Sequence, residues 1–126
     1  MPDITIESFG YGHDAPPQAH LTLDLRHHFR DPHINPQLRG LTAHDKPVRR
    51  AVLNTPGIRP LLTATVHQAL AYRQGPSSGP LTIAVGCVGG RHRSATVAHC
   101  LARRLRRRGL TVDLKHRDLT KPIIQR

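Results

Sequence analysis

The chain has 126 residues, with 19 Lys or Arg against 8 Asp or Glu and a formal net charge of +11. This length suits a single domain over residues 1–126 and is too short for two packed cores. With two Phe, two Tyr and no Trp, the core is expected to consist of Leu, Val, Ile and Ala, and base-stacking platforms are not expected. The basic excess favours a polyanion or a phosphorylated ligand. However, 16 of the 19 basic residues are Arg, a bias that a GC-rich genome also produces.

Two cysteines, Cys87 and Cys100, are too few for a disulfide framework. The longest apolar stretch is too short to span a bilayer, and the N-terminus lacks the basic start and apolar run of a signal peptide. We therefore expect a soluble, cytoplasmic protein with no membrane partner.

Apolar and polar residues alternate in two segments of the first third of the chain, which predicts strands over 3–8 and 21–26. Glycines and prolines predict a loop over 9–17. A long irregular loop is predicted over 27–40, and long loops in compact domains are often functional.

The middle of the chain is expected to be helical. A short helix is predicted over 47–53, with Asp45 as its cap and a proline in its first turn. The apolar spacing over 58–73 is that of an amphipathic helix. Residues 74–80, rich in Gly, Pro and Ser, are predicted to form a surface linker.

The last third predicts a strand, a loop, a helix and a strand in succession. Residues 81–86 form a nearly continuous apolar run, typical of a central strand. A glycine loop over 87–91 leads into a helix over 92–108, which Gly109 ends, and a strand follows over 110–115. The chain is therefore predicted to be α/β, with about four strands and three helices on a small, at least partly parallel sheet.

The segment 86–94, G-C-V-G-G-R-H-R-S, carries the clearest chemical signal. Glycines let backbone N–H groups approach an anion, and the start of a helix adds partial positive charge. Side chains that donate to a phosphate are also present, so a phosphate ester is the expected ligand. The candidate binding residues are Cys87, Gly89, Gly90, His92, Arg93 and Ser94, with Arg91 as a further donor.

Two alternatives to a binding loop stay open. The glycines can simply form a strand-to-helix turn in a structural or partner-binding module. The spacing of Cys87 and Arg93 also fits the C-x5-R pattern of cysteine-dependent phosphatases, with Asp45 as candidate general acid. Gly86 stands where those enzymes usually have His. The Walker A pattern G-x-x-x-x-G-K-[ST] is absent, so ATP binding by that loop is not predicted.

Two further features concern ligands. The segment 23–33 follows a predicted strand and offers Asp24 and His33 to a sugar or an amine, although, taken alone, a solvated loop with a buried Asp–Arg pair explains it better. The chain has ten His but no C-x-x-C pair and no H-E-x-x-H helix, so neither a metal site nor a cofactor is expected.

Arginines crowd the end of the last predicted helix. Phosphate-backbone binding, with RNA as the partner, explains this cluster, and a solvated basic face explains it as well. Its members are Arg103, Arg104, Arg106, Arg107 and Arg108.

Several ordered motifs together resemble the C-terminal domain of RapZ-type RNase adapter proteins. They are S-F-G-Y from Ser8, L-D-L-R from Leu23, D-P-H from Asp31, L-T-I-A-V-G-C-V-G-G-R-H-R-S from Leu81 and K-H-R-D from Lys115. The resemblance runs nearly from end to end. It implies a regulatory domain rather than an enzyme, one that binds small RNAs, senses glucosamine 6-phosphate and acts as a homo-oligomer.

Carried over by position, the resemblance places the sugar-phosphate site on six residues: Asp24, His33, Cys87, Gly89, His92 and Arg93. On this basis an Arg93→Ala change is expected to abolish ligand binding without unfolding the chain. Val88 replaces the family's usual Thr, and Ala43 replaces the usual Gly. The family's N-terminal P-loop domain has no counterpart in this sequence, so nucleotide binding is not carried over.

Overall fold

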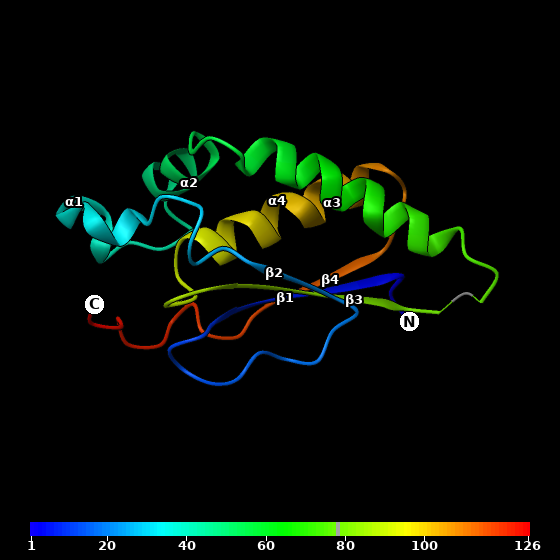
Figure 1. The fold of residues 1–126 in the computed structure, drawn as a ribbon, viewed down its shortest axis with the longest axis horizontal. Helices are drawn as coiled ribbons and strands as arrows, with labels where there is room; N and C mark the ends of the chain where they lie inside the picture. Colours follow the sequence, from blue (N-terminus) through cyan, green and yellow to red (C-terminus); the bar gives the residue numbers. More distant parts are fainter. Residues whose placement is uncertain (78) are drawn as a thin grey trace.

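The computed structural model describes residues 1–77 and 79–126. Its centre is a four-stranded sheet in the order β2-β3-β1-β4, in which every pair of neighbours is parallel (Figure 1). The strands are β1 (Ile4–Gly10), β2 (Leu21–Asp24), β3 (Leu81–Cys87) and β4 (Val112–His116). The predicted α/β class and parallel sheet are confirmed.

The helices cover one face of this sheet (Figure 1). They are α1 (Pro36–Arg39), α2 (Lys46–Leu53), α3 (Ile58–Arg73) and α4 (Arg93–Arg107). Helix α4 packs on β1, β3 and β4, while α3 packs on α4 and β3. None of the helices in the described residues is long and apolar enough to cross a membrane.

The core lies between the helices and the sheet, and it is aliphatic as predicted. The strands contribute alternate residues to it, such as Ile4 and Ile6 of β1 and Ile83 and Val85 of β3. Helix α4 contributes an apolar stripe that includes Leu101 and Leu105. Both cysteines are free thiols.

The predicted irregular loop over 27–40 is the main difference between expectation and structure. It contains a 3-10 helix, η1 (Pro32–Ile34), followed by α1. The carboxylate of Asp31 accepts the N–H of His33, and the amide oxygen of Asn35 accepts the N–H of Gln37. The two prolines therefore stand at the starts of short helices, where a missing N–H costs nothing.

The other differences concern boundaries. Strand β1 continues two residues beyond the predicted end because Phe9 and Gly10 still pair with β3. Strand β2 ends at Asp24, two residues early, and β4 begins two residues late. Of the predicted linker 74–80, residue 78 lies outside the described residues.

The connections after β1 and β3 leave in opposite directions. The loop after β1 runs beneath the sheet to β2, whereas the chain after β3 passes through α4 above the sheet to β4 (Figure 1). Ligands of open α/β sheets bind at the carboxyl ends of strands at such a switch point. Here β1 and β3 end side by side, and the glycine loop 88–91 begins there.

Candidate functional site

The glycine loop packs directly on the end of β1. A Cβ on Gly10 would lie 2.5 Å from the carbonyl carbon of Gly89, and one on Gly90 would lie 2.8 Å from the nitrogen of Gly10. Gly90 also has a φ of 76°, which favours glycine. These two glycines are therefore required by the fold.

Gly89 is different because, although it is buried, it has room for a side chain. Among the described residues, a Cβ added there would meet only the guanidinium of Arg126, with Nη2 at 3.6 Å and Nη1 at 3.9 Å. The absence of a side chain at Gly89 thus leaves a space between the loop and the guanidinium of Arg126.

Cys87 lies beneath the loop and is 2% exposed. Its thiol donates to the hydroxyl of Ser94 at 3.1 Å, and its sulfur accepts the N–H of Gly90 at 3.3 Å. Ser94 lies inside α4 and is fully buried, so its hydroxyl is directed to the sulfur and does not cap the helix. Cys87 and Ser94 therefore support the loop from inside.

Arg93 is also buried, at 2% exposure, and its guanidinium points to the loop after β2. Its Nη1 donates to the carbonyls of Leu25, Arg26 and Phe29 at 2.9, 3.1 and 3.1 Å. Its Nη2 pairs with the carboxylate of Asp31 at 3.3 Å. Arg93 thus fastens residues 25–31 to the start of α4, and both of its terminal amines are occupied.

The two residues before Arg93 act in a similar way. Arg91 donates to the carbonyls of Gly40, at 3.1 Å, and Lys121, at 3.2 Å, so it joins two distant segments. The Nε2 of His92 donates to the carbonyl of Leu41 at 2.8 Å. Burial lowers the pKa of His92 despite this bond, so the ring is neutral at pH 7 with its proton on Nε2.

Asp31, which the site assignment from sequence omitted, joins the loop to the end of the chain. Its Oδ2 pairs with Arg93 and also accepts a bond from Nε of Arg126 at 2.9 Å. Burial alone would raise the pKa of Asp31, but the N–H of His33 and the two guanidiniums hold it below its usual value. The D-P-H motif was the signal for this residue, since an Asp before Pro caps a short helix.

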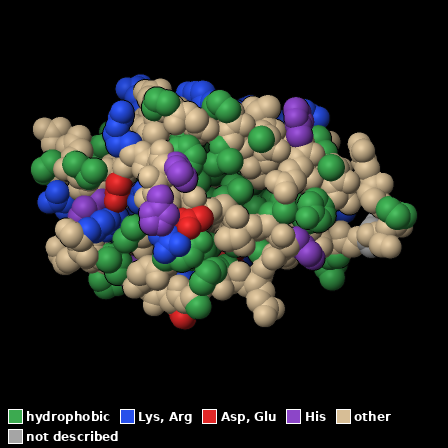
Figure 2. All heavy atoms as spheres, viewed as in Figure 1, with side chains coloured by type: hydrophobic (Ala, Val, Ile, Leu, Met, Phe, Trp, Pro, Cys, Tyr) green, Lys and Arg blue, Asp and Glu red, His purple; other side chains and the backbone are tan. Residues whose placement is uncertain are grey.

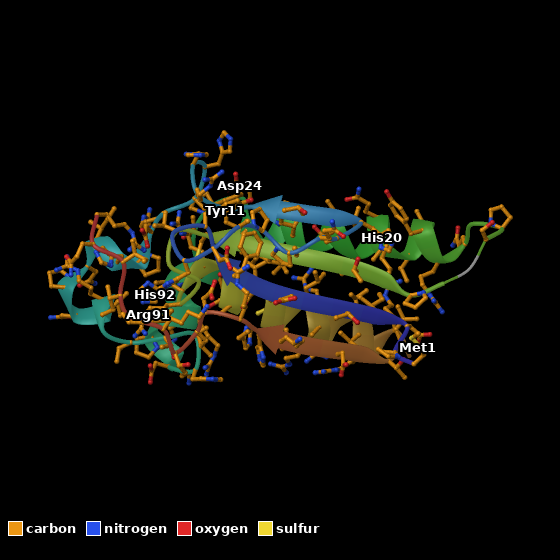
Figure 3. All side chains as sticks on the ribbon, turned by 90° about the horizontal axis from the view of Figure 1, so that it is seen from below. Met1, Tyr11, His20, Asp24, Arg91 and His92 are labelled. Atoms are coloured by element: carbon orange, nitrogen blue, oxygen red, sulfur yellow. The ribbon has the colours of Figure 1, made fainter. Side chains whose placement is uncertain are left out.

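His33 and Asp24, both assigned to the site from the sequence, occupy different surroundings. His33 is 8% exposed in η1, and burial and the charge of Arg126 lower its pKa. Asp24 pairs with Arg26 at 2.8 Å, and the Arg26 guanidinium lies 3.6 Å over the Tyr11 ring. Figure 3 shows Asp24 beside Tyr11, away from Arg91 and His92. Asp24 is the register partner of Gly86, directly before Cys87, with its carboxylate engaged by Arg26. His33 follows Asp31, which pairs with Arg93 at the start of α4.

Asp45 stands at the start of α2 as predicted, but its carboxylate does not cap that helix. Its Oδ2 accepts the N–H of Thr42 at 2.9 Å.

A buried carboxylate, Asp118, fixes the chain after β4 beside the loop. It accepts the N–H of Gly10 at 2.7 Å and pairs with Arg117 at 2.8 Å and Lys121 at 2.6 Å. Burial would raise its pKa, but these partners lower it to about 2. Asp118 thus holds the end of β1 and the tail together.

The arginines at the end of α4 divide between two sides. Arg106 donates to the carbonyl of Val112 at 2.8 Å and so turns toward β4. Arg104 donates to the hydroxyl of Thr63 on α3 at 3.0 Å. A groove between the helices is lined by Arg103, Arg104, Arg107 and Arg59, the last of which the sequence analysis did not assign to the basic face. Arg108 extends this side, next to Arg107.

Charged side chains are unevenly distributed on the face shown in Figure 2. On the face shown in Figure 2, the acidic side chains and most of the basic ones lie toward the end that carries α1. The carboxyl ends of the strands lie at that end (Figure 1). No group of three His, Cys, Asp or Glu residues in the described part of the chain is arranged to hold a metal ion.

Comparison with known proteins shows which family of sequences the chain matches. The sequence profile of the RapZ C-terminal domain matches residues 2–120. A nucleotide-binding protein of Thermobifida fusca is 42% identical over 117 residues, which cover 90% of this chain and 40% of that protein. One of Bifidobacterium adolescentis is 41% identical over 123 residues, covering 94% and 39%. The chain thus spans about two fifths of the length of these curated relatives.

Proposed function

Because the chain belongs to the RapZ C-terminal domain family, we propose that it is a regulatory domain that binds a phosphate ester, of which glucosamine 6-phosphate is the first candidate. The ester binds on the glycine loop and is not cleaved. The proposal places the domain in the cytoplasm, where sugar phosphates occur.

The observation that carries this proposal is the space beside Gly89, where a Cβ would meet only the guanidinium of Arg126 among the described residues. Gly89 lies two residues after β3 ends at Cys87 and three residues before His92, the N-cap of α4. The first turn of α4 contains no acidic residue, so the partial positive charge of the helix start is not cancelled there. A phosphate at this point meets backbone donors and a positive field together.

The same surroundings argue against phosphoryl transfer to Cys87. A nucleophile must reach the phosphorus atom, but the Cys87 sulfur is buried beneath the loop and bonded to Ser94 and Gly90. In the C-x5-R mechanism the arginine binds the phosphate oxygens, whereas both terminal amines of Arg93 are bonded to the protein and its Nε, which has no partner among the described residues, is buried. Binding without turnover is the function that this geometry favours.

A phosphorus NMR time course tests the proposal. Glucosamine 6-phosphate is mixed with the purified protein, and a shift or broadening of the ester signal without inorganic phosphate is expected. A Cys87-dependent inorganic phosphate signal would instead establish the phosphatase, because a Cys87→Ser control removes the nucleophile. An unchanged spectrum would contradict ligand binding.

The groove between α3 and α4 favours RNA as a second ligand. Four arginines from two helices line it, and such a surface matches successive phosphates better than one helix face would. Combined Arg103→Glu, Arg104→Glu and Arg107→Glu changes should weaken RNA binding and reduce the magnitude of its logarithmic salt slope by about 2. RNA binding that is absent, or insensitive to salt, would contradict this second function.

The name of these relatives does not by itself assign nucleotide binding to this chain. They are named nucleotide-binding proteins as whole proteins, of which the match covers about two fifths. The 126 residues here contain no G-x-x-x-x-G-K-[ST] pattern. We therefore propose sugar-phosphate rather than nucleotide binding, and a homo-oligomer, which light scattering would detect, as the assembled form.

A further inference from the structure

A phosphate dianion on the glycine loop needs a cationic side chain with donors to spare. In the neighbouring arginines, Arg91 and Arg93, the only donor atoms without a partner in the described part of the chain are the buried Nε atoms, and the terminal amines are bonded to the protein. Arg93 is buried with both terminal amines bonded, and Arg91 holds the carbonyls of Gly40 and Lys121. His92 is neutral and donates its proton to Leu41.

Arg126 covers Gly89, the buried loop glycine that has room for a side chain. Its Nη2 is 3.6 Å and its Nη1 is 3.9 Å from the place that a Cβ of Gly89 would take. Its Nε donates to Asp31 at 2.9 Å and its Nη1 to the carbonyl of Ile124 at 2.6 Å. Within the described residues, Nη2 donates no hydrogen bond. A terminal amine with free donors therefore faces the candidate site.

The tail that carries Arg126, residues 117–126, is held against the domain by several contacts. Arg91 donates to the carbonyl of Lys121, and Lys121 pairs with the buried carboxylate of Asp118. Ile124 lies against Gly12, with its Cγ1 3.2 Å from the place of a Gly12 Cβ. In Figure 1 the tail runs along the carboxyl ends of the strands and ends beside α1.

We propose that Arg126 is the phosphate-binding arginine of this domain, supplied by the tail in place of Arg93; this rests on the proposed function of the loop. Asp31 orients the guanidinium of Arg126 over Gly89. A phosphate on the loop then accepts from Nη2, and it competes with Asp31 for the remaining donors. The ion pair between Arg126 and Asp31 is partly exposed, at 24% for the Arg126 side chain and 14% for Asp31. Water therefore screens it, and turning the guanidinium toward a phosphate costs little free energy.

This arrangement also makes the tail responsive to ligand. Arg126 is anchored on Asp31, which Arg93 ties to the loop after β2. A phosphate that draws Arg126 toward Gly89 therefore changes the contact between the tail and residues 25–31. Ligand binding is expected to reduce amide exchange over the tail as well as over the glycine loop.

The test compares the affinities of three proteins for inorganic phosphate and glucosamine 6-phosphate by calorimetry. Arg126→Gln should weaken both by roughly 10- to 100-fold, the value of a charge-assisted hydrogen bond. Arg126→Lys keeps the positive charge but loses the paired donors of the guanidinium, so its affinity should lie between those of wild type and Arg126→Gln. Arg50→Gln, an exposed change on α2, controls for the loss of one positive charge and should bind like wild type.

The possible outcomes separate this proposal from the one it rests on. If wild type binds neither probe, the proposed function fails. If wild type binds and Arg126→Gln binds equally well, only the role of Arg126 is refuted. Loss of binding together with a fall of more than about 5 °C in the ligand-free melting temperature would make Arg126 a structural residue and would overturn the proposal.

Discussion

Replacing Arg93 with Ala is expected to destabilise the fold as well as the site. The side chain is 2% exposed and donates to three backbone carbonyls while it pairs with Asp31. Breaking a buried ion pair by removing one partner costs about 3–5 kcal/mol. The hydrogen bonds of a charged donor contribute about 1.5–3 kcal/mol each and are not additive, so a total near 4 kcal/mol is consistent with both ranges.

Thermal unfolding measures this cost. For a domain of this size, a loss near 4 kcal/mol lowers the melting temperature by roughly 10–20 °C. Arg50→Ala, on the exposed face of α2, is the matched control and should change the free energy of unfolding by less than about 0.5 kcal/mol. An Arg93→Ala protein that melts within 2–3 °C of wild type would refute the assignment of Arg93 as the fastener of residues 25–31.

Three further predictions concern the loop, the tail and pH. Gly90→Ala should prevent folding or lower the melting temperature strongly, because Gly90 has a φ of 76° and a Cβ there would lie 2.8 Å from the nitrogen of Gly10. Gly89→Ala should keep the fold and weaken phosphate binding. Calorimetry and thermal unfolding of the two variants check this, and equal melting temperatures would contradict it. The pKa of Asp118 is lowered to about 2, so its contribution to stability is present above pH 4 and is lost between pH 4 and 2; urea unfolding of wild type and Asp118→Asn should differ at pH 5 and converge near pH 2. The pKa values of His33, His92, His99 and His116 are all lowered by burial, so these residues bind protons more readily when unfolded, and stability should decline as the pH falls below 6.5; a stability that rises from pH 7 to 5 would be inconsistent with their burial.

The periodicity of apolar residues was enough to predict the layers of the fold. The continuous run over 81–86 pointed to a central strand, and it lies between two neighbours in the sheet. The stripe on α4 was equally clear, since a helix covering three strands must present one apolar face. The short helices after β2 were missed because one or two turns produce no periodicity, and their prolines indicated loop as readily as helix starts.

A candidate site could be proposed from the sequence, but the directions of its side chains could not. The glycine loop before α4 was recognised because its glycines indicate a tight backbone geometry between a strand and a helix. The directions of side chains depend on tertiary contacts, so Arg93 was taken for a phosphate ligand although it binds backbone carbonyls. Arg126 and Asp31 meet across 95 positions of sequence, and no local pattern indicates such a pair. Asp24 was assigned from its place after a predicted strand and by resemblance, and its ion pair with Arg26 agrees with the Asp–Arg pair that the sequence offered as the alternative.

The central claim is that the glycine loop binds a phosphate ester, and amide NMR during a glucosamine 6-phosphate titration tests it most directly. The account predicts saturable shifts at Gly89 and over residues 91–95, with a smaller change at Arg126. The Arg103 to Arg108 amides should stay unchanged, because that face is assigned to RNA. Shifts confined to the α4 arginines, or none at saturating ligand, would contradict the claim.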